Sequence, residues 1–435
     1  MRIFIGSKEV AGIFTFLYLG FKELGIDTSI FLPEQHIYKY QDVQKSQIEK
    51  ILSQIYRHIY QKRKLKIVRV IGYSIYSFIK FWIHLFYFPY ILFRYDVFIF
   101  SSGETFFWGY DLPIFRFFGK KVIAVFTGSD TRPVYINPYL HGTSPRILVQ
   151  KAKWQKRLLQ KLERNNVICI NNPPTAIFHS KPYIKWLKIG IPVKRESGKK
   201  VAVTRLETVP QRVVEILHSP SNTGIKGSKH ILKAMKKIQA EYQDENKKEL
   251  KFTLLKGVPN HKVVDYIQGS DFMIDQLFSD TPMAVFASEA AYFGKPSVVA
   301  GTYAKDILQH YKPEDIPPSL YILPEQLENA IKKIIEDDTF RLELSQAAQK
   351  FVQEKWSLTE VAKKYLRIIN DDIPNDWWSD PNNDLTDMYP IGEEEVVLPI
   401  IQKIIDQYGI AALQISDKPY LEKRILERVK KFTKR

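Results

Sequence analysis

The chain has 435 residues, of which 45% are hydrophobic and 26% are charged. This composition excludes a disordered or low-complexity protein, and the length favours two domains over one core. A formal net charge of +17 attracts nucleic acid, anionic lipid or phosphorylated small molecules without choosing among them. The single cysteine, Cys169, excludes an internal disulfide, which favours a reducing compartment.

The first half of the chain alternates short apolar runs with amphipathic helical patterns. Runs typical of buried strands occupy residues 3–5, 29–32, 97–100, 122–126 and 167–170. Helical patterns cover residues 14–24 and 150–164. Because strands that alternate with helices form parallel sheets, we expect an N-terminal α/β domain over residues 1–190. Residues 1–6 resemble a strand and lack the regions of a signal peptide, so we expect a cytoplasmic protein.

Residues 57–95 combine a cluster of basic side chains with a run of aromatic ones at positions 73–95. The basic residues are Arg57, Lys62, Arg63, Lys64, Lys66 and Arg69. Lys80 and His84 interrupt the apolar stretch and Pro89 is expected to break the helix, which leaves too short a run to span a membrane. We expect a helix that lies on an anionic membrane surface, with a helix packed in the domain core and a true span as alternatives. The segment is too apolar for the solvated groove of a nucleic-acid-binding protein, so we expect no nucleic acid partner.

The second half repeats the alternation after a stretch rich in glycine, proline and charge at residues 185–200, which is typical of a linker. We place a second α/β domain at residues 191–372. Its expected strands are residues 214–217, 252–255, 272–274, 297–300 and 321–323, and its expected helices are residues 229–242, 261–267, 287–293 and 327–335. Residues 373–435 break the pattern and are expected to form a helical extension, with helices near residues 393–408 and 418–434.

One loop in the second domain has the composition of an anion site. It follows an expected strand, precedes an expected helix, and contains His218, Ser221, Asn222, Lys226 and Gly227. Free backbone N–H groups and the helix dipole make such a helix N-terminus attractive for a phosphate. Lys226 adds a mobile positive charge for a diphosphate, and Gly227 lets the backbone approach the ligand. A capped helix start with a surface lysine is the alternative interpretation.

A second segment, residues 275–299, follows the next strand of this domain. Its Glu289 is expected in the first turn of a helix that ends at Gly294, where a carboxylate can accept hydrogen bonds from ribose or sugar hydroxyls. The alternative is a glutamate that the helix dipole favours. The same segment contributes three further residues to the predicted donor-binding set, namely Asp275, Gln276 and Ala284.

Together these segments resemble the retaining GT-B glycosyltransferases of the GT4-like family (glycosyltransferase group 1) over most of residues 1–370. In that family a Lys-Gly loop holds the donor diphosphate and a later glutamate holds the nucleotide ribose, roles that map onto Lys226 and Glu289. The resemblance implies two Rossmann-like domains that face each other across a cleft, the first for the acceptor and the second for the donor. It also implies transfer of a sugar from a UDP- or GDP-sugar with retention of configuration, without an obligatory metal and without an enzymic nucleophile.

The N-terminal half shares the resemblance. The family places a glycine-bearing loop after its first strand, facing the donor, which maps onto residues 6–12 and their Gly12. Asp130 and Arg132 follow the carboxyl end of another strand, where open α/β sheets bind ligands. With Lys226 they are the expected catalytic residues, and a loop-internal Asp–Arg pair is the alternative for these two.

Two departures from the family pattern bear on function. Many members carry an earlier second glutamate, which would fall at Thr281, and a glycine pair near the donor sugar, where residues 282–284 are Pro-Met-Ala here. The missing glutamate favours one alternative, a catalytically silent GT-B protein that binds a nucleotide sugar or a protein partner. A non-enzymatic protein that binds membrane or nucleic acid through its charge is another. For the active enzyme we expect a lipid-linked or surface-polysaccharide acceptor, reached from the inner face of the cell membrane.

Overall fold

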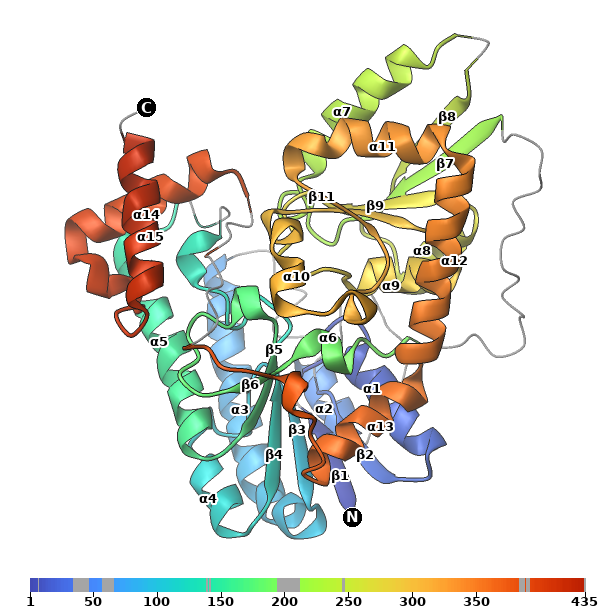
Figure 1. Cartoon of the computed structure of the whole chain (residues 1–435). Helices are drawn as coiled ribbons and strands as arrows, with labels where there is room; N and C mark the ends of the chain where they lie inside the picture. The colour runs from blue at the N-terminus through green and yellow to red at the C-terminus, as the bar shows by residue number, and fades with distance from the viewer. Residues whose placement is uncertain are drawn as a thin grey trace.

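The structure is a computed structural model that describes residues 1–6, 8–33, 47–56, 66–137, 140, 142–193, 212–244, 247–382, 388 and 392–433, with the backbone alone at 66–70, 302 and 305. Two sheets flanked by helices make up most of the molecule, and a group of C-terminal helices lies beside the first sheet (Figure 1). The predicted fold class, two Rossmann-like α/β units with a helical C-terminal extension, is confirmed.

The first unit is built on a seven-stranded sheet with the order β12-β6-β5-β4-β3-β1-β2 in the described chain. Its strands are β1 (Arg2–Gly6), β2 (Asp27–Phe31), β3 (Val97–Ser101), β4 (Lys121–Val125), β5 (Ile168–Asn171), β6 (Tyr183–Lys185) and β12 (Trp378–Ser379). Its helices are α1 (Ile13–Glu23), α2 (Gln47–Tyr56), α3 (Lys66–Arg94), α4 (Leu112–Phe117), α5 (Pro145–Arg164) and α6 (Trp186–Ile189). Every strand pairing is parallel except that of β12 with β6. Hydrophobic clusters cover both faces of the sheet, which explains why its strands are unbroken apolar runs.

The second unit is built on a five-stranded parallel sheet, in the order β11-β10-β9-β7-β8 for the described residues. Its strands are β7 (Val213–His218), β8 (Glu249–Leu254), β9 (Phe272–Gln276), β10 (Ser297–Ala300) and β11 (Leu320–Ile322). Its helices are α7 (Ser228–Glu241), α8 (Asn260–Gln268), α9 (Val285–Tyr292), α10 (Ile307–His310), α11 (Leu327–Glu336) and α12 (Asp338–Lys355). The strand positions predicted for both units are confirmed.

The connection between the two units packs tightly. After α6 the chain turns at Gly190, which has a φ of +89°, and a Cβ atom there would lie 2.2 Å from the indole of Trp356. Val193 then donates its backbone N–H to the carbonyl of Trp356 at 2.9 Å. A glycine with positive φ lets the crossing chain lie against the second unit at this point. The rest of the expected linker, residues 194–211, lies outside the described residues, and the domain boundaries stay a prediction.

The chain returns to the first unit through α13 (Leu358–Ile369), which packs on α1. A Cβ atom on Gly20 of α1 would lie 2.2 Å from the carbonyl oxygen of Leu358, so this glycine permits the close approach of the two helices. Then β12 joins the first sheet and α14 packs on α5, with α15 beside it (Figure 1). The two helices expected in the extension are confirmed as α14 (Glu394–Tyr408) and α15 (Pro419–Thr433).

Helix α3 corrects one prediction. It runs unbroken for 29 residues through Pro89, so the expected helix break at this proline is wrong. Pro89 and Leu85 lie on the exposed side of the helix, where the carbonyl that loses its N–H partner stays open to water. Within the described chain, residues 71–94 have the length and composition of a membrane-spanning helix, and 28% of their most apolar window is buried.

The two sides of α3 differ in their surroundings. One side packs into the core of the first unit with Tyr76, His84, Phe88, Ile91 and Leu92. The opposite side, called here the outer face of α3, exposes Phe78, Trp82, Phe86, Tyr90 and Phe93. The helix therefore belongs to the domain core along one side and leaves a row of aromatic rings in solvent along the other.

Candidate functional site

The loops that follow the carboxyl ends of the two sheets meet at one ion pair. Arg132 follows β4 of the first sheet and Asp280 follows β9 of the second. The guanidinium donates two hydrogen bonds to the carboxylate, from Nε to Oδ2 at 2.5 Å and from Nη2 to Oδ1 at 2.6 Å. The two side chains are only 12% and 6% exposed. The carboxyl edges of the sheets therefore face each other, and this is where open α/β sheets bind ligands.

The predicted anion loop lies at the carboxyl end of β7. Gly227 caps α7 with a φ of +67°, and a Cβ atom there would lie 2.6 Å from Cβ of Leu277. Lys226 precedes it, with its ammonium 3.2 Å from Oδ1 of Asp275 near the end of β9. β7 and β9 are neighbours, so the loop and Asp275 share one edge of the sheet. Asp275 is buried, and its Oδ2 has no hydrogen-bond partner among the residues that the structure describes.

The N-terminus of α9 is open to an anion, whereas that of α7 is partly occupied, because the backbone N–H groups of Gly227 and Ser228 donate to the carbonyls of Gly224 and Thr223, both at 2.8 Å. Neither helix has a side chain that caps its first N–H groups, and neither has an acidic residue in its first turn. Ala284, the residue before α9, has an extended backbone and contributes no polar side chain. Lys226 and the N-termini of α7 and α9 thus follow two neighbouring strands, and together they make this edge positive, which suits a phosphate.

The loop after β1 is arranged differently. Gly12 caps α1 with a φ of +84°, as a tight turn into a helix requires. The buried carboxylate of Glu9 accepts hydrogen bonds from the backbone N–H groups of Phe14 and Thr15 at 3.3 and 2.9 Å. Because this side chain already satisfies the free N–H groups, the N-terminus of α1 is closed to a phosphate in this structure. Gly12 therefore shapes the turn, and its predicted contact with the donor has no support from this geometry.

His218 is a buried positioning residue. Its Nδ1 lies 2.7 Å from the carbonyl oxygen of Ile274, and its Nε2 lies 2.8 Å from Oγ of Ser228. Burial lowers its pKa to about 4, so the ring is neutral. The ring links β7, β9 and the first residue of α7, with both nitrogens engaged inside the protein. These contacts support an indirect role for His218, and its predicted contact with the donor stays a prediction.

Asn222 and Gln276 also act within their own loops. Oδ1 of Asn222 accepts the backbone N–H groups of residues 224–225 at 3.0 and 3.2 Å, which fixes the turn before Lys226. The amide of Gln276 donates to Oγ of Ser279. Ser221 lies exposed on the surface of the loop. These contacts shape the two loops that carry the charged residues of the site.

Glu289 lies one helical turn later than predicted. Because α9 begins at Val285, Glu289 is its fifth residue and falls in the second turn, so the first-turn prediction is wrong. The physical reason is that the extended backbone ends at Ala284, so the helix begins at Val285 instead of at the expected residue 287. The carboxylate accepts from Nδ2 of Asn260 at 3.0 and 3.2 Å. Burial raises its pKa to about 7, while the bond from Asn260 lowers it.

For a nucleotide held by Glu289, as the sequence resemblance implies, we expect the affinity to fall as the pH drops below about 7, because protonation removes one of the two acceptor oxygens of this carboxylate. Above pH 8 the carboxylate is ionised and the affinity should reach a plateau. The ratio of the Kd for UDP in Glu289→Gln to that in the wild type, measured from pH 6 to pH 8.5, isolates this residue from the titration of UDP itself. A ratio that does not change with pH would remove Glu289 from nucleotide binding.

Asp130 organises the loop that carries Arg132. Its carboxylate accepts the backbone N–H groups of Thr127, Gly128 and Thr131 at 3.1, 2.9 and 3.2 Å. Arg132 pairs with the second unit instead of with Asp130, so the alternative of a loop-internal Asp–Arg pair is wrong. Of the two predicted residues, only Arg132 reaches across to the second sheet.

Sequence reasoning missed Asp280 and Asn260. Asp280 immediately precedes Thr281, where the family pattern has its earlier glutamate, so a carboxylate displaced by one position was a usable signal. Asn260, at the start of α8, is 29 positions from Glu289, and no local pattern connects the two. Only packing of α8 against α9 brings them together.

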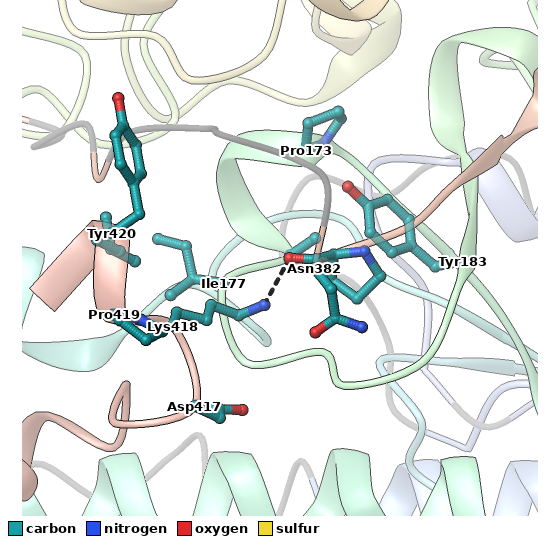
Figure 2. Close-up of a pocket in the computed structure, with 11 residues that line it drawn as sticks. Pro173, Ile177, Tyr183, Asn382, Asp417, Lys418, Pro419 and Tyr420 are labelled. Atoms are coloured by element: carbon teal, nitrogen blue, oxygen red, sulfur yellow. Dashed lines mark hydrogen bonds between the residues drawn. The ribbon is translucent and has the colours of Figure 1, made fainter.

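A cavity of about 130 Å³ lies where the extension meets the first unit (Figure 2). Residues from both parts line it, among them Pro173, Ile177, Tyr183, Asp417, Lys418 and Tyr420. The ammonium of Lys418 donates to the carbonyl of Pro381 at 2.8 Å, as the dashed line in Figure 2 shows. This bond ties two segments of the extension together, and we assign the cavity no ligand.

Comparisons with known proteins return structural likeness only. No family model matches the sequence, and no curated protein matches it. Among solved structures the chain is similar to Anabaena HepE in complex with UDP, with 11% identity, a TM-score of 0.43 and coverage of 85% of this chain and 100% of that chain. It is similar to WaaG, a glycosyltransferase involved in lipopolysaccharide biosynthesis, with 12% identity, a TM-score of 0.44 and coverage of 85% of this chain and 99% of that chain. It is also similar to trehalose-6-phosphate synthase, with 10% identity, a TM-score of 0.49 and coverage of 86% of this chain and 100% of that chain.

Proposed function

We propose that this chain is a glycosyltransferase that takes its sugar from a nucleoside diphosphate sugar. The observation that carries this proposal is one edge of the second sheet, where Lys226 and the N-terminus of α7 follow β7 and the helix that bears Glu289 follows the neighbouring strand β9. The lysine and the helix suit a diphosphate, and the carboxylate suits the hydroxyls of a ribose. The sequence resemblance to retaining GT-B enzymes assigns the same roles to these residues.

The chemistry follows from where charge develops. As the sugar leaves, the diphosphate gathers negative charge, and Lys226 with the dipoles of α7 and α9 stabilises that charge more than it stabilises the bound donor. Retention of configuration and a UDP or GDP carrier follow from the resemblance. In such enzymes the leaving phosphate takes the acceptor proton, so no side chain is assigned as a nucleophile.

One observation favours an active enzyme over the catalytically silent alternative. Asp280 stands one position before Thr281 and brings a carboxylate to the cleft, where the family pattern has its earlier glutamate. Its partner Arg132 comes from the first unit. The neighbouring residue thus supplies the carboxylate that position 281 lacks.

The test separates nucleotide binding from turnover. A ligand that binds only the folded state raises its melting temperature, so UDP, GDP and ADP are compared in a thermal-shift measurement. We expect UDP or GDP to raise the Tm, and the matching sugar nucleotide to release that diphosphate when a membrane extract supplies the acceptor. Binding without release for every donor tested would favour the silent alternative. No shift with any of the three nucleotides would contradict the proposal.

We further propose that the outer face of α3 lies on the anionic inner face of the cell membrane and that the acceptor is lipid-linked. Phe117, the last residue of α4, and the next residue, Phe118, continue this aromatic row, and the rings of Phe93 and Phe118 lie 5.4 Å apart. Arg94 and Arg116 are exposed beside it. Aromatic rings flanked by cations suit the interface of an anionic bilayer, and exposed apolar patches mark interaction sites.

Vesicle flotation tests the membrane proposal. We expect the protein to float with vesicles of phosphatidylcholine and phosphatidylglycerol and to float less with phosphatidylcholine alone. The double variant Phe86→Ser/Phe117→Ser should lose flotation, because these rings are 78% and 84% exposed and their loss leaves the core intact. Tyr408→Ser, at an exposed ring on α14, is the matched control. A double variant that floats like the wild type would exclude this surface as the membrane contact.

A further inference from the structure

We infer that a cavity between α3 and the loop after β3 binds the acceptor, and that this acceptor is a saccharide bearing an anionic group. The inference rests on the proposed transferase function and names the substrate class of its acceptor side. The cavity has a volume of about 270 Å³. Lys8, residues 104–106, Trp108, Trp154 and one side of α3 line it. Of these residues only Lys8 belongs to a segment predicted to face the donor, the loop of residues 6–12, and none is among the predicted donor-binding residues.

The cavity lies at the edge of the first sheet that faces the second sheet. Lys8 follows β1 and residues 104–106 follow β3, at the same carboxyl edge that carries Arg132 after β4. Because Arg132 contacts Asp280 of the second unit, this edge borders the cleft. A molecule bound there faces the donor edge, as transfer between two bound substrates requires.

Two tryptophans form the walls that suit a sugar ring. Trp108 and Trp154 are each 54% exposed, and both line the cavity. An indole offers an apolar ring face for stacking, and its N–H offers a polar contact at the ring edge. The C–H face of a pyranose stacks on such a ring while its hydroxyls reach polar groups. Trp108 comes from a loop and Trp154 from α5, so two elements converge on one ligand.

Trp108 is held in a strained backbone conformation. Its φ is +50°, a region that costs non-glycine residues about 1–3 kcal/mol and persists where the surroundings enforce it. The enforcing group is the buried carboxylate of Asp111, which accepts from the backbone N–H of Phe106 at 3.0 Å and from the hydroxyl of Thr105. That hydroxyl oxygen in turn accepts the backbone N–H of Gly109 at 2.8 Å. These hydrogen bonds therefore fix the backbone of the loop that carries the indole of Trp108.

The polar lining fits hydroxyls and an anion. Lys8 and Lys80 bring two positive charges against the single carboxylate of Glu104. Nδ1 of His84 lies 3.2 Å from the carbonyl oxygen of Phe106, so this nitrogen donates. Burial lowers the pKa of His84 to about 4, which keeps the ring neutral and makes Nε2 an acceptor. Nε2 is buried and has no hydrogen-bond partner in the described part of the chain, and a ligand hydroxyl would satisfy it.

The position beside α3 agrees with a lipid-linked acceptor. The same helix supplies Lys80 and His84 to the cavity and carries the exposed aromatic row on its outer face. A saccharide phosphate anchored in a bilayer under that face would enter the cavity with its phosphate near the two lysines. The two lysines thus suit the phosphate of such an acceptor, and the two tryptophans suit its sugar.

Binding of three soluble probes tests the inference. The probes are n-octyl glucoside, n-octyl phosphate and n-octyl glucosyl phosphate, with Kd measured by calorimetry below their micelle concentrations. We expect the glucosyl phosphate to bind most tightly. Trp154→Ala should raise Kd for both sugar probes by about tenfold or more and leave n-octyl phosphate unchanged. Lys80→Met should weaken only the two phosphate probes.

Two controls separate this inference from the transferase function. Tyr408→Ala removes an exposed ring that does not line the cavity and should leave all three Kd values unchanged. The UDP-induced rise in Tm should persist in Trp154→Ala, which shows an intact donor site. Equal Kd values for the sugar probes in Trp154→Ala and wild type, or no binding of any probe to a wild type that binds UDP, would overturn the acceptor assignment. A wild type that binds the probes and no nucleotide would overturn the transferase function alone.

Discussion

Replacing Lys226 with methionine is expected to lower kcat for sugar transfer by about 10²–10³-fold, the cost of removing one preorganised group that stabilises developing charge. Methionine keeps an unbranched side chain and removes the charge that faces the departing diphosphate. Because that charge interacts more strongly with the transition state than with the bound donor, kcat should fall more than KM for the donor rises. Steady-state kinetics with the donor identified by thermal shift measure both constants.

The same substitution should also lower the stability of the fold. A second variant is needed to separate this effect from the effect on kcat. The carboxylate of Asp275 is 1% exposed and lies 3.2 Å from Nζ of Lys226. Removing one partner of a buried ion pair costs about 3–5 kcal/mol, because the other charge is left uncompensated. Adding Asp275→Asn removes that charge. We expect Lys226→Met/Asp275→Asn to recover most of the melting temperature and none of the kcat.

Lys233, on the exposed side of α7, provides the matched control. Lys233→Met removes the same kind of charge from α7, the helix that follows Lys226, without touching the edge of the sheet, so its kinetics should equal those of the wild type. If Lys226→Met kept the wild-type kcat, the diphosphate would not lie against this lysine.

The fold is predictable where burial leaves a simple pattern. Helices cover both faces of each sheet, so most strands are unbroken apolar runs that can be recognised without a partner. β6 and β12 escape recognition because strands of three and two residues are too short to show a pattern. The helix through Pro89 escapes for another reason: the rule that proline breaks helices neglects a position whose freed carbonyl faces water.

The site is predictable only where one loop supplies the whole arrangement. Lys226 and Gly227 are recognised because strand, loop and helix follow each other in sequence. In the sequence His218 looks like a residue that contacts a ligand. In the structure it is buried, and its two ring nitrogens contact Ile274 and Ser228. Asp280 is 148 positions from Arg132, and nothing in either loop indicates that the two side chains meet. Contacts between the two units arise from tertiary packing, and no local pattern in a single sequence predicts them.

The ion pair between Arg132 and Asp280 is expected to set the separation of the two units, and its loss should lower kcat/KM by about 10²-fold through misplacement of the substrates. Arg132→Met leaves a largely buried carboxylate without its cation, and Asp280→Asn leaves the guanidinium with a neutral partner. Both costs are relieved if the units move apart and water enters the cleft. We therefore expect each variant to have a larger radius of gyration in small-angle X-ray scattering, together with the loss of activity.

The double variant decides whether the two residues act as one unit. If the two residues act only through their ion pair, Arg132→Met/Asp280→Asn should lose no more activity than the less active of the two single variants. The second substitution then removes a charge that is already uncompensated. The exposed pair of Lys237 and Glu328, at 2.6 Å, serves as control, and Lys237→Met should change neither measurement because exposed pairs contribute about 0–1 kcal/mol. Additive losses of activity at an unchanged radius of gyration would mean that each side chain contacts a substrate separately and that the pair does not hold the units together.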